Sequence, residues 1–283
     1  MKAIKQEVKI TAVYGFAGLV VFAVGLLVFG TWYDWWMGYN TNTATISDGS
    51  CNIAVVPLVG EIIPYAEVDQ DGSGDILSPS TNPDDILATL RTAEADSNIR
   101  GVLVRIDSGG GSPVASEIIA NGFKRSSLPI VALIRETGAS GAYLAATGAK
   151  TIIASAFSDI GSIGMTMSYI GYAEKNTKEG LQYIPLTSAK FKDSGNPDKP
   201  LTSSERALFE RDLNIFHEQF IKEVAENRNL LVAQVAKLAD GSSMPGSLAL
   251  QNKLIDAIGD QETARNWFAE QLKISPEEVV FCE

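Results

Sequence analysis

Residues 137–146 read TGASGAYLAA and follow a short apolar run at 130–134 that predicts a buried strand. Small residues fill a tight turn, and an apolar helical segment begins at Ser140. A serine at that place exposes its hydroxyl beside the unpaired N–H groups of the first helical turn. Strand, turn, serine and helix in this order are typical of a nucleophile elbow, although the G-x-S-x-G spelling is absent. An ordinary helix-capping serine is the alternative interpretation.

Strands and helices alternate on both sides of this stretch, which predicts an α/β fold with a largely parallel sheet. The expected strands lie at 53–63, 101–106, 130–134, 151–154, in the run from 158 to about 169, and at 181–187. The expected helices lie at 84–96, 113–126, from 140 onward, and at 202–227. The last of these is long and amphipathic, and Thr202 with Glu205 forms a capping-box pattern at its start. Its apolar stripe predicts contact with the core or with another subunit.

The N-terminal part predicts a membrane anchor. Three lysines within residues 1–9 precede an uncharged run at 10–32, which at 1.5 Å per residue spans roughly the 30 Å of a bilayer core. Residues 33–50 then read as an interfacial aromatic belt and a polar linker. We therefore expect a cytoplasmic N-terminus, a single pass through the cell (inner) membrane, and a body at 51–283 on the extracytoplasmic, periplasmic side. A cleaved signal peptide is the alternative, but the run is long for one and lacks an A-x-A-like site.

Composition restricts the partners and ligands. The formal net charge of -11 leaves little positive charge to follow phosphates, so nucleic acid is not an expected partner. One histidine, His217, and two cysteines exclude a multi-histidine or cysteine-rich metal site, and we expect no cofactor and no metal. Cys51 and Cys282 lie at opposite ends of the body. A disulfide between them and two unpaired buried thiols both fit the sequence.

A nucleophilic serine needs a base. A Ser-His-Asp triad would have to use His217, which lies inside the 202–227 helix and which we interpret as structural. A lysine replaces histidine where burial disfavours its ammonium form, and Ser-Lys pairs are a known variant of the triad. Lys190 and Lys192 both follow a predicted strand, and a solvated surface position is the alternative for each.

Three successive glycines at 109–111 follow the strand at 101–106. Such a run lets backbone N–H groups converge on developing negative charge. Phosphate binding is the competing function, but the spacing fits neither a Walker A loop nor G-x-G-x-x-G, and a plain flexible turn is the remaining alternative.

Together these segments resemble peptidase family S49, the signal peptide peptidase SppA type of serine peptidase. The resemblance covers roughly residues 53–259. The motifs that carry it are RIDSGGGS at 105–112, ASGAY at 139–143, GSIG at 161–164, KDSGNP at 192–197, and DG at 240–241 with LID at 254–256. Each motif is weak alone, and their order behind a single anchor makes the combination specific.

The resemblance implies a ClpP/crotonase-like spiral of β-β-α units that assembles into a homo-oligomeric ring at the lipid bilayer. The activity it implies is hydrolysis of cleaved signal peptides or other hydrophobic peptides through an acyl-enzyme. In such rings the serine and lysine can come from neighbouring subunits. The roles it implies are nucleophile for Ser140, general base for Lys192, oxyanion-hole donors for Gly111 and Gly141, turn former for Gly110, and support of the lysine amine for Ser162.

Departures from the family pattern are Gly109 for proline, Ala142 for glycine and Asn196 for serine. Asp107 also adds a charge near the expected oxyanion site, where it would oppose the intermediate if it points inward. Two other functions remain open at this point. One is a catalytically inactive, membrane-tethered scaffold of the same fold. The other is a crotonase-type acyl-CoA enzyme, against which the exported location argues.

Overall fold

A computed structural model describes residues 45–65 and 79–282 of the 283-residue chain. The expected cytoplasmic segment and transmembrane anchor, and the aromatic belt with most of the linker, lie outside these residues. In the two described ranges, no helix is both long enough and apolar enough to cross a membrane. Residues 45–283 form one compact unit, which contains the fold described below.

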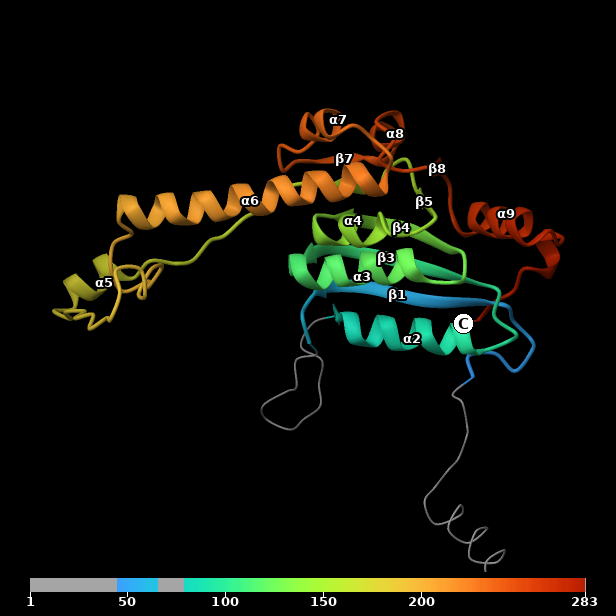
Figure 1. Ribbon diagram of the computed structural model, residues 1–283, viewed down its shortest axis with the longest axis horizontal. Helices are drawn as coiled ribbons and strands as arrows, with labels where there is room; N and C mark the ends of the chain where they lie inside the picture. Colours follow the sequence, from blue (N-terminus) through green and yellow to red (C-terminus); the bar gives the residue numbers. More distant parts are fainter. Residues whose placement is uncertain (1–44, 66–78, 283) are drawn as a thin grey trace, which may run out of the picture. The chain divides into compact units, whose positions relative to one another are not determined.

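A mostly parallel sheet forms the centre of this unit, as the sequence predicts (Figure 1). Within the described residues the sheet has nine strands, six of them in the order β2-β1-β3-β4-β5-β8. The strands are β1 (Ile53–Ile62), β2 (Ser80–Thr81), β3 (Gly101–Gly111), β4 (Ile130–Ala139), β5 (Thr151–Ala154), β6 (Asp159–Gly161), β7 (Ser243–Pro245), β8 (Ala257–Ile258) and β9 (Phe281–Cys282). β3 and β4 continue five residues beyond their predicted ends, so the glycine run belongs to the sheet itself.

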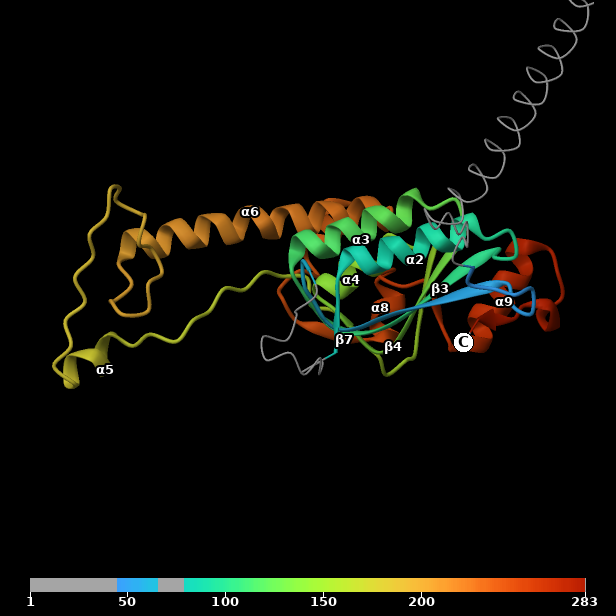
Figure 2. The ribbon, with the colours of Figure 1, turned by 90° about the horizontal axis from the view of Figure 1, so that it is seen from below.

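Helices cover both faces of the sheet (Figures 1 and 2). α2 (Pro83–Ala95), α3 (Pro113–Arg125) and α4 (Gly141–Ala146) lie over one face, and α9 (Gln261–Leu272) packs on the other. Side chains along β3 alternate accordingly: Val102 and Val104 join the core under α2–α4, whereas Leu103 joins the core under α9. Coverage of both faces explains why these strands read as apolar runs without alternation. The remaining helices are α5 (Ala173–Lys178), α7 (Val232–Ala236), α8 (Gly246–Gln251) and a 3₁₀ turn at Pro276–Glu278.

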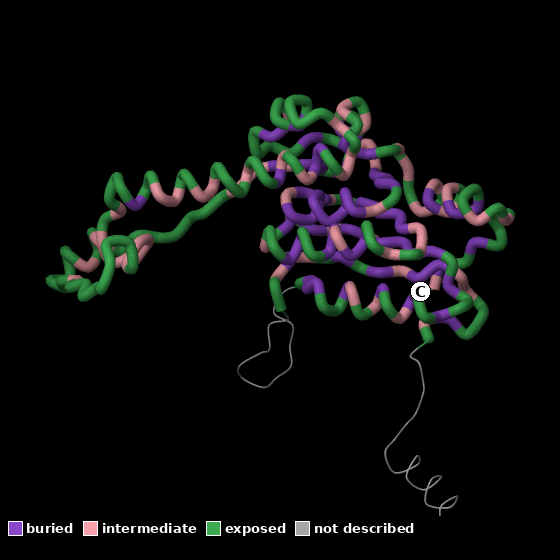
Figure 3. The backbone as a smooth tube through the Cα atoms, viewed as in Figure 1, coloured by how far each residue is buried: buried purple, intermediate pink, exposed green. Residues whose placement is uncertain are grey.

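The long helix α6 (Ser203–Asn227) carries part of the chain away from the sheet. Its 25 residues span about 37 Å at 1.5 Å per residue. Only its C-terminal turns bury apolar side chains against the body, at Phe220, Val224 and Ala225. Figures 1 and 2 show residues 165–202 beyond the sheet, around the N-terminal end of α6, and Figure 3 shows that they are largely exposed. We call residues 165–202 the arm.

The capping box at the start of α6 is confirmed: Thr202 accepts from the Glu205 N–H, and the Glu205 carboxylate accepts from the Thr202 N–H. The strands predicted at 181–187 and after β6 to about residue 169 are wrong, since residues 162–169 and 181–187 have no strand structure and most of them lie in the arm. An extended segment becomes a strand only where a neighbour completes its hydrogen-bond ladder, and the arm runs beyond the edge of the sheet. The apolar residues of these two stretches therefore do not indicate membership of the sheet.

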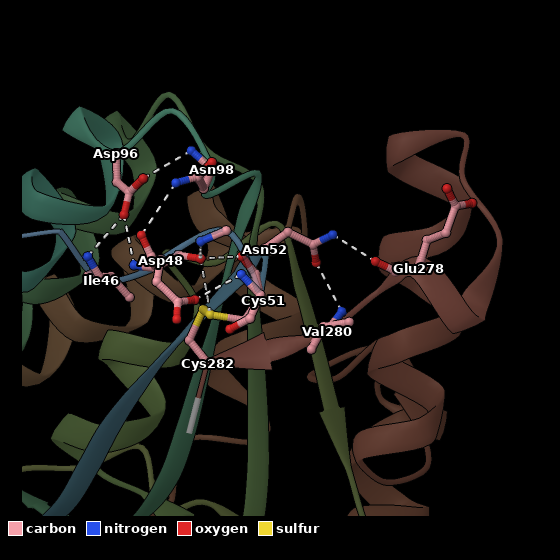
Figure 4. The surroundings of a disulfide bond; sticks show 12 residues. Ile46, Asp48, Cys51, Asn52, Asp96, Asn98, Glu278, Val280 and Cys282 are labelled. Carbon is pink, nitrogen blue, oxygen red and sulfur yellow. Dashed lines mark hydrogen bonds between the residues drawn. A yellow bond between two sulfur atoms is a disulfide. The ribbon is translucent and has the colours of Figure 1, made fainter.

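A disulfide joins the two ends of the unit, which decides between the two alternatives for the cysteines. Cys51 and Cys282 are bonded, with Cα atoms 5.2 Å apart and a sequence separation of 231 residues. β9 lies parallel to β1 at the same place. Figure 4 shows Asn52 beside the bond, where it donates to the Glu278 carbonyl at 2.7 Å and accepts from the Val280 N–H at 3.0 Å. The last strand is thereby fastened to the first.

Removal of this disulfide should destabilise the body strongly. The double variant C51S/C282S is expected to lose about 5 kcal/mol of unfolding free energy, because closure of so long a loop removes much entropy from the unfolded chain. The measurement is guanidinium unfolding of the wild type and the double variant, both without reductant. Equal midpoints would contradict the expectation, and the single variants show what a free thiol alone does.

Candidate active site

Ser140 occupies the corner between β4 and α4 in a strained conformation. Its φ is 51° and its ψ is -125°, a region that residues other than glycine rarely adopt. Its N–H donates to the Gly161 carbonyl at 2.7 Å, and its carbonyl accepts from the Leu144 N–H at 3.0 Å. Its half-buried side chain makes no capping hydrogen bond to the helix. Ser140 is therefore not an ordinary helix-capping serine, the alternative that its sequence position left open.

The predicted oxyanion-hole glycines lie beside this corner. Gly110 has a φ of 103°, and a Cβ on it would lie 2.6 Å from the Gly141 nitrogen and 2.9 Å from the Ser140 Cβ. The Gly111 nitrogen lies 3.3 Å from the place that a Cβ on Gly141 would occupy. The structure thus brings these three glycines and Ser140 together. As the first residue of α4, Gly141 has an N–H without an intrahelical partner, which suits hydrogen bonding to an oxyanion.

Two side chains that the sequence reasoning missed support the glycines of the site: Ser108 supports the glycine run, and Ser116 lies against Gly141. The Ser108 hydroxyl donates to the Gly60 carbonyl at 2.5 Å and accepts from the Gly110 N–H at 3.1 Å. The Ser116 hydroxyl lies 2.3 Å from the place of a Cβ on Gly141, so it packs directly under that residue. The signal for Ser108 was its position just before the glycines. The Asp107 carboxylate accepts from the Thr137 N–H of β4 at 3.2 Å, so one of its oxygens is engaged by the neighbouring strand.

Ser162 lies next to Ser140 through the pairing of β6 with β4. Ala139 and Gly161 are register partners, and the two serines are the residues that follow them. Ser162 also has a positive φ of 51°. Its N–H donates to the Ser242 carbonyl at 3.0 Å, and its hydroxyl donates to the Gly241 carbonyl at 3.0 Å. A hydroxyl that donates one hydrogen bond can still accept another from an amine.

Lys192 belongs to the arm, and Figures 1 and 2 show the arm extending away from the corner of β4 and α4, to which Ser140 belongs. Its loop packs against the N-terminal part of α6, where the place of a Cβ on Gly195 lies 3.1 Å from the Phe209 ring. Phe220, which enters the core of the body, is 11 residues further along α6, about 16 Å at the helical rise. The Lys192 side chain is exposed, and the neighbouring Lys190 ammonium lies 4.8 Å from the centre of the Phe191 ring.

Another lysine of the arm, Lys199, is held in its charged form. Its ammonium lies 2.7 Å from Glu205 and 3.3 Å from Asp193. The hydrogen bond to Glu205 is the main cause that raises the pKa of Lys199, and the same bond is the main cause that lowers the pKa of Glu205 to about 2. The Tyr183 hydroxyl, followed by other hydrogen bonds, lowers the pKa of Asp193. Lys199 is thus a structural cation and a poor candidate for a general base.

Comparison with known proteins identifies the family. Residues 122–275, more than half of the chain, match the model of peptidase family S49.

The chain belongs to peptidase family S49.

This is a family of serine peptidases, and the match includes Ser140, Ser162 and Lys192 but begins after the glycine run. Among the S49-like relatives, one from Methanocaldococcus jannaschii named "Putative protease" is 32% identical over 236 residues, 82% of this chain and 74% of that protein. A "Putative signal peptide peptidase SppA" from Enterococcus faecium is 28% identical over 83% of this chain and 69% of that protein. "Protease 4" from Haemophilus influenzae is 31% identical over 78% of this chain, which spans about a third of that longer protein.

The contact between the glycine loop and the serine corner makes a stability prediction. Gly110→Ala should lose at least about 2 kcal/mol of unfolding free energy, because its Cβ meets backbone atoms at a φ that alanine disfavours. Gly109→Ala is the matched control: nothing lies within 4 Å of its Cβ position, and it should stay within about 0.5 kcal/mol of the wild type. Chemical unfolding of the two variants measures the difference, and similar losses in both would refute the assigned close approach.

The lowered pKa of Glu205 makes a second prediction, on pH dependence. An acid whose pKa falls from 4.5 in the unfolded chain to about 2 in the folded protein adds stability above pH 4.5 and loses that contribution as the pH falls toward 2. The difference in melting temperature between wild type and Glu205→Gln should therefore be largest above pH 5 and shrink toward pH 2. Glu218→Gln, on an exposed pair of the same helix, should show little difference at any pH. A difference in melting temperature between wild type and Glu205→Gln that stays constant with pH would contradict the lowered pKa of Glu205.

Proposed function

We propose that this S49 peptidase is a membrane-anchored endopeptidase that hydrolyses hydrophobic peptides, cleaved signal peptides among them, with a Ser140–Lys192 dyad. The observation that carries the proposal is the corner of β4 and α4. There a strained serine, free of any capping hydrogen bond, adjoins the backbone nitrogens of Gly111 and Gly141. Such a corner suits a nucleophile whose attack creates an oxyanion. The relative named as a signal peptide peptidase supports the substrate class.

The chemistry proceeds through an acyl-enzyme. The Ser140 hydroxyl attacks the scissile carbonyl and transfers its proton to the neutral Lys192 amine, while the N–H groups of Gly111 and Gly141 hydrogen bond to the oxyanion. Collapse of this intermediate breaks the C–N bond, and the Lys192 ammonium gives its proton to the departing amine. A water molecule then attacks the ester, its proton passes to Lys192, and collapse returns a proton to Ser140 as the new carboxylate leaves.

In our proposal, Lys192 of one subunit acts on Ser140 of a neighbouring subunit. The arm has large apolar side chains that face solvent, among them Leu186, which is 94% exposed. On α6, Phe216 is 54% exposed. Apolar surface of this extent favours burial against another copy, and a homo-oligomeric ring of ClpP/crotonase-like β-β-α spirals would bury it. Burial at that interface would also remove Lys192 from water, which favours the neutral amine that the mechanism needs.

The location of the body outside the cytoplasm fits two features. Residues 10–32 have the length and composition of a transmembrane anchor, with lysines on the side that predicts a cytoplasmic N-terminus. The Cys51–Cys282 disulfide is typical of proteins that fold in an oxidising compartment. An active site tethered at the bilayer would meet membrane-derived peptides at high effective concentration.

A catalytically inactive, membrane-tethered scaffold is the second candidate. The observation that favours it is the placement of Lys192 on an exposed arm, away from the Ser140 of its own chain. The two candidates differ in whether assembly supplies the missing partner.

The dyad makes a direct prediction. Ser140→Ala and Lys192→Ala should each lower kcat/KM on a fluorogenic apolar peptide by at least about 1,000-fold, because each removes a group that forms or breaks bonds. Lys190→Ala, an exposed lysine two residues away, is the matched control and should keep its activity. A serine-reactive fluorophosphonate should label the wild type at Ser140, which peptide mass spectrometry locates. Turnover retained in either dyad variant would refute the mechanism, and an inert, unlabelled wild type would favour the scaffold.

Co-expression tests whether the dyad forms between subunits. Mixed particles of the Ser140→Ala and Lys192→Ala chains contain interfaces with both an intact serine and an intact lysine. Such particles should regain a measurable fraction of the wild-type activity, although each variant alone is inactive. No recovery in mixed particles, verified by differently tagged chains, would contradict the proposal that Lys192 acts on the Ser140 of a neighbouring subunit.

A further inference from the structure

The loop that carries Lys192 is compact and has a defined inner side. The Lys192 N–H donates to the Ala189 carbonyl at 3.1 Å, and the Ser194 N–H donates to the Phe191 carbonyl at 3.2 Å. These successive turns leave the Lys192 side chain exposed and turn the adjacent Asp193 inward, where its side chain is 17% exposed. Whatever fixes Asp193 therefore fixes the backbone from which Lys192 projects.

Asp193 is the centre of a polar cluster inside the arm. Its Oδ1 accepts from the Tyr183 hydroxyl at 2.9 Å and from the Asn196 side-chain amide at 3.0 Å. The same amide donates to the Tyr183 oxygen at 2.7 Å, which closes a triangle of three side chains. The Lys199 ammonium faces the other carboxylate oxygen, Oδ2, at 3.3 Å.

Lys199 connects this cluster to α6. Its ammonium donates to Glu205 at 2.7 Å, and Glu205 is only 4% exposed although it is an acid in the first turn of the helix. The second Glu205 oxygen accepts from both the N–H and the hydroxyl of Thr202, at 2.9 and 2.8 Å. A continuous path of hydrogen bonds and ion pairs therefore runs from the neighbour of Lys192 into the capping box of a 25-residue helix.

We propose that Asp193 and Lys199 are positioning residues for Lys192. Together with Glu205 they form a charged clamp between the loop that carries Lys192 and the first turn of α6. The proposal rests on the function proposed for Lys192. One cation lies between two acids, so the clamp needs all three charges: without Lys199, two largely buried carboxylates would face each other without compensation.

A clamp of this kind meets a specific need of a base on an arm. A base that must reach a serine outside its own body gains little rigidity from that body, and an error of about 1 Å in its position can lower the rate about 100-fold. In the proposed mechanism, the scissile peptide bond contacts the glycine run and the serine corner and does not contact this cluster. Loss of the clamp should therefore reduce kcat and leave KM nearly unchanged.

The test uses the full-length chain in detergent micelles or lipid nanodiscs. Lys199→Met keeps the length of the side chain without its charge, and Asp193→Asn keeps the shape of the carboxylate. Each should lower kcat on an apolar fluorogenic peptide about 10- to 100-fold, with KM within about twofold of the wild type and an unchanged particle size. Lys199→Arg, which keeps the cation, should recover most of the loss. Lys222→Met, from an exposed ion pair on α6, is the matched control and should match the wild type.

The outcomes separate this proposal from the proposed function. If Lys192→Ala keeps its turnover, the dyad itself is wrong. If Lys192→Ala is inactive while Lys199→Met and Asp193→Asn both keep full kcat, the dyad stands and the clamp is overturned. A loss of kcat that comes with dissociated particles or a raised KM would also overturn it, because the residues would then serve assembly or substrate binding. A loss of kcat alone, recovered by Lys199→Arg, supports the clamp.

Discussion

The close approach of the β3 glycine run to the serine corner is the contact on which the candidate site depends. A Cβ on Gly110 would lie 2.6 Å from the Gly141 nitrogen, so only a glycine lets the two backbones meet. The strained Ser140 persists because β6 holds its N–H and α4 holds its carbonyl. Ser108 supports the loop from the other side through its bond to Gly60. Nucleophile and oxyanion-hole candidates are thus presented by backbone geometry that packed elements impose.

The molecule divides its proposed chemistry between two regions with different sources of rigidity. The body is rigid because helices cover both faces of its parallel sheet and because a disulfide joins the two ends of the body, at Cys51 and Cys282. None of the apolar side chains of the arm is buried, and charged hydrogen bonds around Asp193, Lys199 and Glu205 order it instead. Such bonds are stronger than neutral ones, and a half-buried network of them can define a loop that no core covers.

Particular residues show how far the sequence could predict this arrangement. The parallel α/β fold, the family and the Thr202–Glu205 capping box follow from local pattern, because hydrophobic period and caps act over a few positions. The glycine run was expected to follow its strand, whereas in the structure it is part of β3. The strands expected at 181–187 and toward residue 169 failed for the opposite reason. A strand needs a neighbour, and local pattern does not say whether one is present. Ser108 was missed as a loop support because its partner, Gly60, lies 48 residues away.

By itself, the sequence determined that the chain is an S49 peptidase with a nucleophile-elbow pattern and a run of three glycines shortly after an apolar segment, since each of these is written in contiguous residues. Only the tertiary structure decided that Cys51 and Cys282 are bonded, that Asp107 binds β4, and that Lys192 lies on an arm apart from its own Ser140. These three outcomes depend on where distant segments meet in space. The sequence gives the chemical nature of each side chain, and the packing of the folded chain decides which other side chains that side chain contacts.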